Sequence, residues 1–371
     1  MTNGRVHSLD AARALLLVFG IPYHVATKSM FDLPVPNAEI RESVFIGVAM
    51  SVNHSFRMFA FFVLSGFFSA LIIHKRGRAA WAKDRLWRLG VPLIASLLTI
   101  GVAQFFIHRD ILGLAAEGMG PLPVTVDHMW FLMVLLMFVG TLYLIPIEGL
   151  AQRPSLAKAV QLRGWQGFAL VSVLAFWGIA RAVFDRVVGE VPGIGILSSY
   201  IYFAPAFAIG TIVYSSGLST SFFKGARPWQ FFAAVILSVV SVVLDTAVRP
   251  AFGITSPKSM PELLVSNALE LPLALLISLC FFALLERLIK RESASIRFLV
   301  GGAMAIYLFH MIWTLLVVKI LLYVSWPGEL QWALGSLVVF GLSALSYLAI
   351  RQNAWLSAAF SGAPLPKGRM K

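Results

Sequence analysis

Continuous apolar stretches recur along this chain, each close to the roughly 20 residues that a helix needs to cross a bilayer. The predicted fold class is therefore all-α, a polytopic integral membrane protein. An outer-membrane barrel is disfavoured because its strands are short and alternate apolar with polar residues. We expect ten transmembrane helices, at approximately 9–27, 52–73, 86–107, 128–147, 166–184, 197–214, 230–248, 264–285, 297–322 and 330–350.

Composition supports the same class. Hydrophobic residues make up 59% of the 371 residues and charged residues 13%, whereas a soluble domain has roughly 45–50% and 25%. The net charge of +13 would suggest nucleic acid as a partner in a soluble protein. Here the basic residues gather in alternate loops, so we expect the lipid bilayer as the partner and no nucleic acid.

Loop charges predict the orientation. The segment 74–88 has six Lys and Arg residues against one acid, Asp84, and the intervening loops are rich in Asp and Glu. The positive-inside rule then places both termini in the cytoplasm, with 351–371 as a cytoplasmic tail. No internal repeat or soluble segment is visible, so we expect a single transmembrane domain over 1–371.

Two polar residues interrupt the first apolar stretch, Arg13 and His24. A charged group near the centre of a span costs roughly 2.5–3.5 kcal/mol, which favours a functional role. Their spacing, eleven residues at about 100° each, puts both on nearly the same helix face, about 16 Å apart along the axis. Asp10 can pair with Arg13 across one turn, or cap the helix start. Gly20 and Pro22 predict a bend close to His24.

Three further apolar stretches have polar residues near or within them. His54 and Arg57 share a face near the non-cytoplasmic end of the second helix, where Arg57 either binds a phosphate or carboxylate or pairs with a loop acid. His128 and Trp130 open the fourth helix and predict either sugar binding or an aromatic belt. His310 lies within the ninth helix, as a site residue or as a satisfied structural group.

Arg85 and Arg88 flank the cytoplasmic start of the third helix. They either reflect topology alone or bind the phosphates of a cytosolic donor. The chain has no Walker A loop, no G-x-G-x-x-G fingerprint and no H-E-x-x-H pair. We therefore expect no metal site and no permanently bound cofactor.

Taken together, these residues resemble the membrane acyltransferase-3 family. The first helix has the Leu-Asp-x-x-Arg start and the Arg-x10-His spacing, with Asp10, Arg13 and His24 in the matching positions. His310 departs from the family pattern of two adjacent His residues, because Met311 follows it. Further matching segments run in order along nearly the whole chain: 20–24, 56–58, 61–68, 88–92, 128–132, 306–310 and 360–362.

The closer resemblance is to the branch that succinylates osmoregulated periplasmic glucans. It implies a bacterial inner-membrane enzyme that transfers an acyl group from cytosolic acyl-CoA, either succinyl-CoA or acetyl-CoA, to hydroxyls of a periplasmic glucan. His24 would be the base or the covalent acyl carrier, with Arg13 and Asp10 beside the donor. Arg57 would bind the distal carboxylate of a succinyl group, and Arg85 and Arg88 the phosphates of CoA.

Two alternatives remain open at this point. Within the same class, the chain would be an O-acetyltransferase for another envelope polysaccharide. In a different class, it would be a transporter for a polysaccharide or an anion, because intramembrane Arg and His also mark transport paths. The absence of an internal repeat argues against a transporter.

Overall fold

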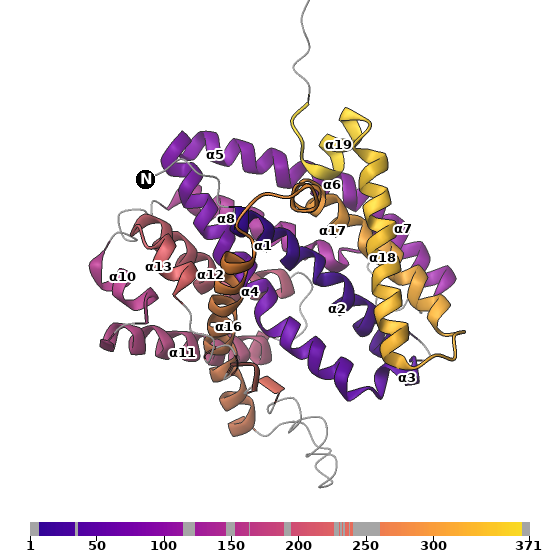
Figure 1. Ribbon diagram of the computed structural model, residues 1–371, viewed down its shortest axis with the longest axis horizontal. Helices are drawn as coiled ribbons and strands as arrows, with labels where there is room; N and C mark the ends of the chain where they lie inside the picture. The colour runs from indigo at the N-terminus through magenta and orange to yellow at the C-terminus, as the bar shows by residue number, and fades with distance from the viewer. Residues whose placement is uncertain are drawn as a thin grey trace, which may run out of the picture. The chain divides into compact units, whose positions relative to one another are not determined.

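The computed structural model describes residues 7–33, 36–113, 123–145, 153–162, 164–188, 194–225, 230, 232, 234–236, 238–239 and 260–365 (Figure 1). These residues contain no β-strand, which confirms the all-α fold class. The helical segments are α1 His7–Val18, α2 Gly20–Thr27, η1 Lys28–Asp32, α3 Ala38–Arg41, α4 Val44–Arg76, α5 Arg78–Arg85, η2 Leu86–Gly90, α6 Val91–Ser96, η3 Leu97–Gly101, α7 Val102–Phe106, η4 Ile107–Ile111, η5 Asp127–Met129, α8 Trp130–Leu144, α10 Pro154–Val160, α11 Gly164–Val188, α12 Ile194–Ser215, α13 Ser219–Lys224, α16 Met260–Leu288, α17 Ala294–Leu321, α18 Gly328–Ile350 and α19 Ala354–Ser361.

Within the described residues, nine helical segments are long and apolar enough to cross a membrane. They correspond to nine of the ten predicted helices, and most of them extend beyond the predicted boundaries by a few residues at one or both ends. The remaining prediction, 230–248, lies mostly outside the described residues. So do several of the basic loop and tail positions, Arg163, Arg227, Lys367, Arg369 and Lys371. The cytoplasmic placement of the termini stays a prediction.

The first predicted span, 9–27, lies within one helical segment, His7–Phe31, which is divided at Phe19 close to the bend that Gly20 and Pro22 predict. Helix α1 ends at Val18, and α2 begins at Gly20. Pro22 has no N–H to donate to the carbonyl of Val18 four residues earlier, which explains a break at this point. The Pro22 carbonyl accepts a hydrogen bond from Nε1 of Trp332 at 2.8 Å. The shared helix face of Arg13 and His24 stays a prediction.

The chain divides into two compact units. Unit 1 consists of Met1–Leu16, Ser51–Ala82 and Met137–Glu292, and unit 2 of Leu17–Met50, Lys83–Leu136 and Ser293–Lys371. Arg13 belongs to unit 1 and His24 to unit 2.

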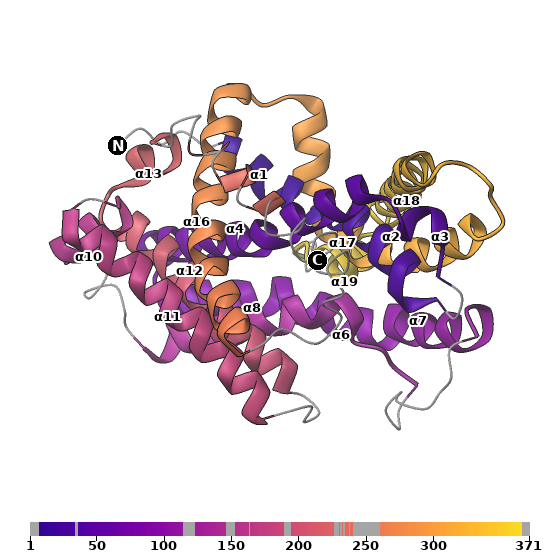
Figure 2. The same cartoon turned by 90° about the horizontal axis from the view of Figure 1, so that it is seen from below.

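In unit 1, glycines allow α4 and α12 to pack backbone to backbone. A Cβ added at Gly66 would overlap the carbonyl oxygen of Phe207, and one added at Gly210 would overlap that of Val63. Small residues permit such close approach between membrane helices. Helix α11 packs along α16 in the same unit (Figure 2).

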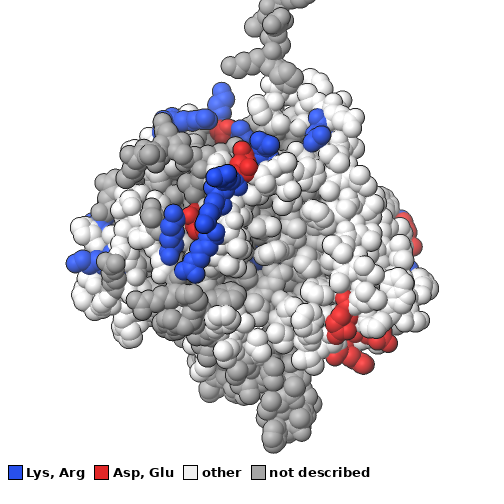
Figure 3. Space-filling model, viewed as in Figure 1, with Lys and Arg blue, Asp and Glu red and all other residues white. Residues whose placement is uncertain are grey.

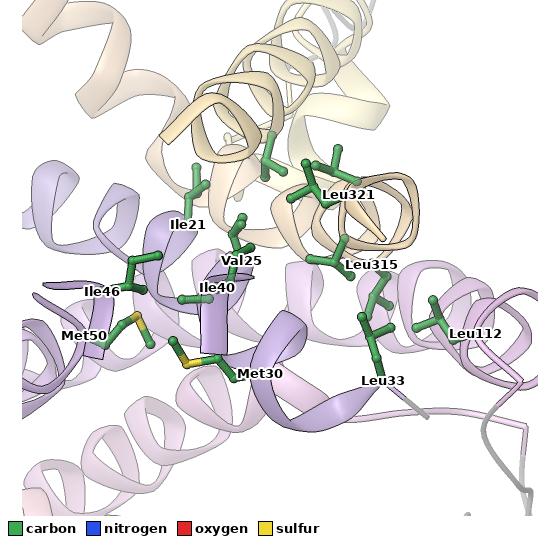
Figure 4. Close-up of a cluster of buried hydrophobic side chains, with 14 of the residues drawn as sticks. Ile21, Val25, Met30, Leu33, Ile40, Ile46, Met50, Leu112, Leu315 and Leu321 are labelled. Carbon is green, nitrogen blue, oxygen red and sulfur yellow. The ribbon is translucent and has the colours of Figure 1, made fainter. Parts of the chain in front are cut away.

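In unit 2, a hydrophobic core forms between α2, η1, α17 and α18 (Figure 4). Ile21 and Val25 of α2 contribute to it together with Leu315 and Leu321 of α17. Burial of these side chains fixes the face that α2 turns toward α17. The core therefore sets the position of His24, which directly precedes Val25.

The surface carries many large apolar side chains. Phe168 is 75% exposed and Phe176 68% on α11, and Leu337 is 65% exposed on α18. Figure 3 shows that much of the face in view has no charged residue. Exposed apolar area of this kind is unfavourable in water and is suited to contact with lipid.

We predict that Gly66→Ala destabilises the protein. The new Cβ would force the α4 and α12 backbones apart, and overpacking of this kind costs roughly 1–3 kcal/mol. A thermal unfolding scan in detergent should show a Tm several degrees lower. Gly140→Ala on α8 is the matched control, because a Cβ there meets nothing within 4 Å. Equal Tm values for the two variants would contradict the close packing.

Candidate active site

Three imidazoles lie next to one another in unit 2. His24 comes from α2, His128 from η5 and His310 from α17. The ring centroids of His24 and His310 are 5.3 Å apart, and those of His310 and His128 are 5.0 Å apart. His310 and His128 are 1% and 2% exposed, whereas His24 is half-buried. His24 is thus the accessible end of a row of three histidines.

Backbone carbonyls fix the tautomers of the two buried rings. Nε2 of His128 lies 3.2 Å from the carbonyl oxygen of Leu308, and Nδ1 of His310 bonds to the carbonyl oxygen of Tyr307. A carbonyl only accepts hydrogen bonds, so each of these ring nitrogens carries the hydrogen. In the neutral rings, Nδ1 of His128 and Nε2 of His310 therefore hold the lone pairs. A lone pair of this kind can accept a proton.

Tyr307 ties η5 to α17. Its hydroxyl donates to the backbone carbonyl of His128. Its ring lies 5.1 Å from the ring of His128 and 5.7 Å from that of His310, measured between centroids. Two hydrogen bonds thus link α17 to the His128 segment, one from the Tyr307 hydroxyl and one from Nε2 of His128. Buried hydrogen bonds of this kind hold the side chains that make them in one arrangement.

An ion pair also connects the start of η5 to the start of η1. Nζ of Lys28 lies 3.3 Å from Oδ2 of Asp127, and Lys28 is 9% exposed. Asp127 has a φ of +31°, a conformation that Asp adopts more readily than most residues. The sequence interpretation missed Lys28. The available signal was a basic residue on the predicted non-cytoplasmic side, against the positive-inside rule.

Histidine is a common metal ligand, so the row of three was compared with the arrangement that a metal site requires. Across the described part of the chain, no group of three or more His, Cys, Asp or Glu side chains is arranged to hold a metal ion. In the histidine row, Nε2 of His128 and Nδ1 of His310 bond to carbonyl oxygens instead.

In unit 1, the predicted pairing of Asp10 with Arg13 is confirmed. An Nη atom of Arg13 lies 2.7 Å from Oδ1 of Asp10. The guanidinium carbon of Arg13 also lies 4.1 Å from the centroid of the Phe68 ring, a cation–π distance. Phe68 ends the segment 61–68 that carries part of the family resemblance. The Arg13 guanidinium is therefore held by a carboxylate and an aromatic face.

Arg57 lies in a polar region of unit 1 that sequence reasoning did not anticipate. Arg57 is 7% exposed, and its charge acts on the neighbouring His54, as do those of Glu270 and Arg181. His54 itself is exposed. The hydroxyl of Tyr202 donates to Glu270 at 2.6 Å. Spacing along the sequence cannot reveal this grouping, because its members come from α4, α11, α12 and α16.

Arg85 and Arg88 are close together in unit 2 and share one carboxylate. Their Nε atoms lie 3.8 Å and 3.0 Å from the oxygens of Asp84. Arg88 is exposed, as a residue that binds a cytosolic phosphate would be. The C-terminal helix ends against this segment, because a Cβ added at Gly362 would lie 2.5 Å from the Arg88 carbonyl oxygen.

Trp130 starts α8 and is half-buried, with its ring centroid 6.4 Å from that of Phe131.

Of the predicted site residues, the structure brings His24, His128 and His310 together in unit 2. It places Asp10, Arg13, His54 and Arg57 in unit 1. The roles of these residues in binding or catalysis stay predictions.

Comparison with known proteins places the chain in a family. The acyltransferase-3 family model, described as an acyltransferase domain, matches residues 6–350. The chain belongs to the acyltransferase-3 family. It is an acyltransferase with multiple membrane-type helices.

Curated relatives of this acyltransferase include the glucans biosynthesis protein C of Escherichia coli K12 and that of Shigella boydii serotype 4. Each is 26% identical to it over 98% of this chain and 96% of the relative. No solved structure matches the chain.

We predict that His310→Asn lowers the kcat of this acyltransferase by roughly 10²–10⁴-fold, the usual contribution of a group that transfers protons. The Asn amide can still donate to the Tyr307 carbonyl in place of Nδ1, but it cannot accept a proton as Nε2 does. Purified variants should be compared in an acyl-transfer assay and a thermal scan. An unchanged kcat in His310→Asn would show that His310 takes no part in proton transfer, and a lower Tm beside it would show that His310 is structural.

Proposed function

We propose that this acyltransferase moves an acyl group, succinyl in preference to acetyl, from cytosolic acyl-CoA to hydroxyls of a periplasmic glucan. The observation that carries the proposal is the half-buried His24 at the end of the row of three histidines. The relatives are named as glucan biosynthesis proteins, which supports a glucan as the acceptor. The enzyme would act in the bacterial inner membrane, with both termini in the cytoplasm.

His24 would act as the base. Histidine is the side chain whose ordinary pKa lies nearest to neutral pH, so it suits proton transfer under physiological conditions. His24 takes the proton from the glucan hydroxyl, and the oxygen attacks the thioester carbonyl. The C–S bond breaks, the proton passes to the CoA sulfur, and the products are the O-acyl glucan and free CoA.

A covalent route uses the same residue. In that route a His24 nitrogen attacks the thioester, CoA leaves as the thiol, and the acyl group then moves from His24 to the glucan oxygen. The two routes differ in whether an acylated protein forms when glucan is absent. Only the covalent route leaves an acyl group on the protein when acyl-CoA is supplied alone.

The donor would be recognised by basic residues. Arg85 and Arg88 would bind the phosphates of CoA at the cytoplasmic side, because guanidinium groups pair with phosphate oxygens in a planar geometry. Asp84 neutralises part of this charge in the free protein. The acyl arm would pass Arg13, which Asp10 and Phe68 hold in place.

A succinyl donor needs a cation for its distal carboxylate, and an acetyl donor does not. Arg57 is the candidate, because it is a buried cation on α4. His128 and Trp130 would contact the sugar, and His54 would lie beside Arg57. A different envelope polysaccharide as acceptor for an acetyl group is the second candidate within this class.

We predict that His24→Ala abolishes glucan modification while the protein stays in the membrane. Mass spectrometry of periplasmic glucans should be compared between cells with the native protein, with the variant and without the protein. Succinyl increments of about 100 Da should vanish in the last two samples. Their persistence in the variant would refute the role of His24, and increments of about 42 Da would indicate an acetyl donor.

We predict that Arg57→Gln lowers kcat/KM for succinyl-CoA by roughly 10–100-fold, because a hydrogen bond to a charged group contributes about 1.5–3 kcal/mol. The value for acetyl-CoA should change little. Arg186→Gln, an exposed arginine near the end of α11, is the matched control. An equal loss of kcat/KM with both donors would mean that Arg57 does not bind the succinyl carboxylate.

A further inference from the structure

Trp87 on η2 has an indole ring that is exposed and yet held in one orientation. The residue is 38% exposed, and its Nε1–H donates to the backbone carbonyl of Ala363 at 3.3 Å. Trp81, on the preceding helix α5, is 0% exposed, so this part of the chain can bury an aromatic ring. The Trp87 ring is instead kept at the surface, and a ring fixed in advance loses little freedom when a ligand binds.

The other exposed tryptophans in the described residues differ from Trp87. Trp165, Trp326 and Trp355 are 73%, 50% and 71% exposed, and their indole N–H groups bond to no described residue. Tryptophan in a membrane interface turns its N–H toward water and lipid headgroups, which fits these three residues. The N–H of Trp87 is bonded inside the protein, so anchoring in the interface does not explain how this ring is held.

The orientation of the indole depends on the turn that ends α19. Gly362 has a φ of +63°, which glycine adopts readily, and it ends the helix in a left-handed turn. The N–H of Ala363 bonds to the carbonyl of Ser357 at 3.4 Å, which holds in place the carbonyl that Trp87 reaches. Helix α19 also packs against α6, which directly follows η2 (Figure 1). The end of α19 is thus a fixed support for the ring.

Basic residues flank Trp87 on its own segment. Arg88 follows it directly, Arg85 precedes it by two residues, and Lys83 lies about one turn before it on the same face. Lys83 and Arg88 are exposed, and Arg85 is half-buried. Asp84 is the one acid of the stretch 83–88 and pairs with both arginines. A flat exposed ring beside several cations is complementary to a nucleotide, which has a flat base and anionic phosphates.

We propose that the indole ring of Trp87 stacks on the adenine base of CoA, beside Arg85 and Arg88. The adenine of CoA is joined to its phosphate groups through a single ribose, so the base and the phosphates must bind close to one another. Aromatic side chains stack on nucleobases because every base has a π face. Cations alone bind any phosphorylated molecule, whereas the ring gives the site a preference for a nucleotide.

This assignment rests on the proposed function, which takes acyl-CoA as the donor and gives its phosphates to Arg85 and Arg88. It adds a binding residue for a part of the donor that does not react. The reacting thioester is at the opposite end of the pantetheine arm from the adenine. Loss of the stacking contact should therefore raise KM for acyl-CoA and leave kcat unchanged, as loss of uniform binding does.

The test is equilibrium dialysis of radiolabelled CoA against the purified full chain in detergent. Trp87→Leu removes the aromatic face, and Trp87→Phe keeps an aromatic face while it loses the N–H. We expect Trp87→Leu to raise the Kd for CoA by roughly 10–100-fold, the usual contribution of one stacked base. Trp87→Phe should raise it far less.

Phosphopantetheine, which lacks the adenosine of CoA, is the second ligand. Its Kd, measured by displacement of radiolabelled CoA, should be the same for the native protein and Trp87→Leu, because it has no base to stack. Trp355→Leu is the matched control, since it removes a more exposed indole from the same unit, and it should bind CoA as the native protein does. A thermal scan of each variant separates loss of binding from loss of folding.

Three results would overturn the assignment in distinguishable ways. If the native protein binds CoA and Trp87→Leu binds it equally well, the adenine lies elsewhere while the proposed donor stands. If Trp87→Leu weakens CoA and phosphopantetheine equally, or if Trp87→Phe binds CoA as weakly as Trp87→Leu, the residue supports η2 and does not stack on a base. If the native protein binds no CoA, the proposed donor is wrong and the adenine site falls with it.

Discussion

Lipid offers no hydrogen bonds, and this constraint shapes every polar feature of the structure. Each buried donor, acceptor or charge must find its partner inside the protein, because leaving it unsatisfied in hydrocarbon costs several kcal/mol. Asp10 therefore bonds Arg13, Lys28 pairs with Asp127, and a buried hydroxyl such as that of Ser278 bonds to its own helix.

The same constraint explains why the histidine row suits catalysis. The carbonyls of Leu308 and Tyr307 satisfy one nitrogen of each buried ring and thereby fix which nitrogen can accept a proton. Around them, low polarity strengthens every remaining electrostatic interaction. A fixed base in a dry environment loses no free energy to reorganisation of water when charge develops in the transition state. His24 is half-buried, whereas His128 and His310 are buried.

Sequence predicts the parts of this structure that depend on local pattern. Long apolar stretches located nine helices, the spacing of Asp10 and Arg13 predicted their ion pair, and Pro22 indicated a bend. Pattern fails where distant segments meet. The ion pair of Lys28 with Asp127 depends on how η1 and η5 pack. The histidines were found one at a time, because their grouping arises only from the core between α2 and α17.

The central claim is that the row beginning at His24 transfers an acyl group between two substrates. The most direct measurement supplies the purified protein in detergent with radiolabelled succinyl-CoA and neutral glucan, without a sealed vesicle. We expect label in the glucan within the first turnover, together with one equivalent of free CoA, and none with His24→Ala. Label that never reaches glucan in detergent would contradict an enzyme of this kind, and glucan movement seen only in sealed vesicles would indicate a transporter.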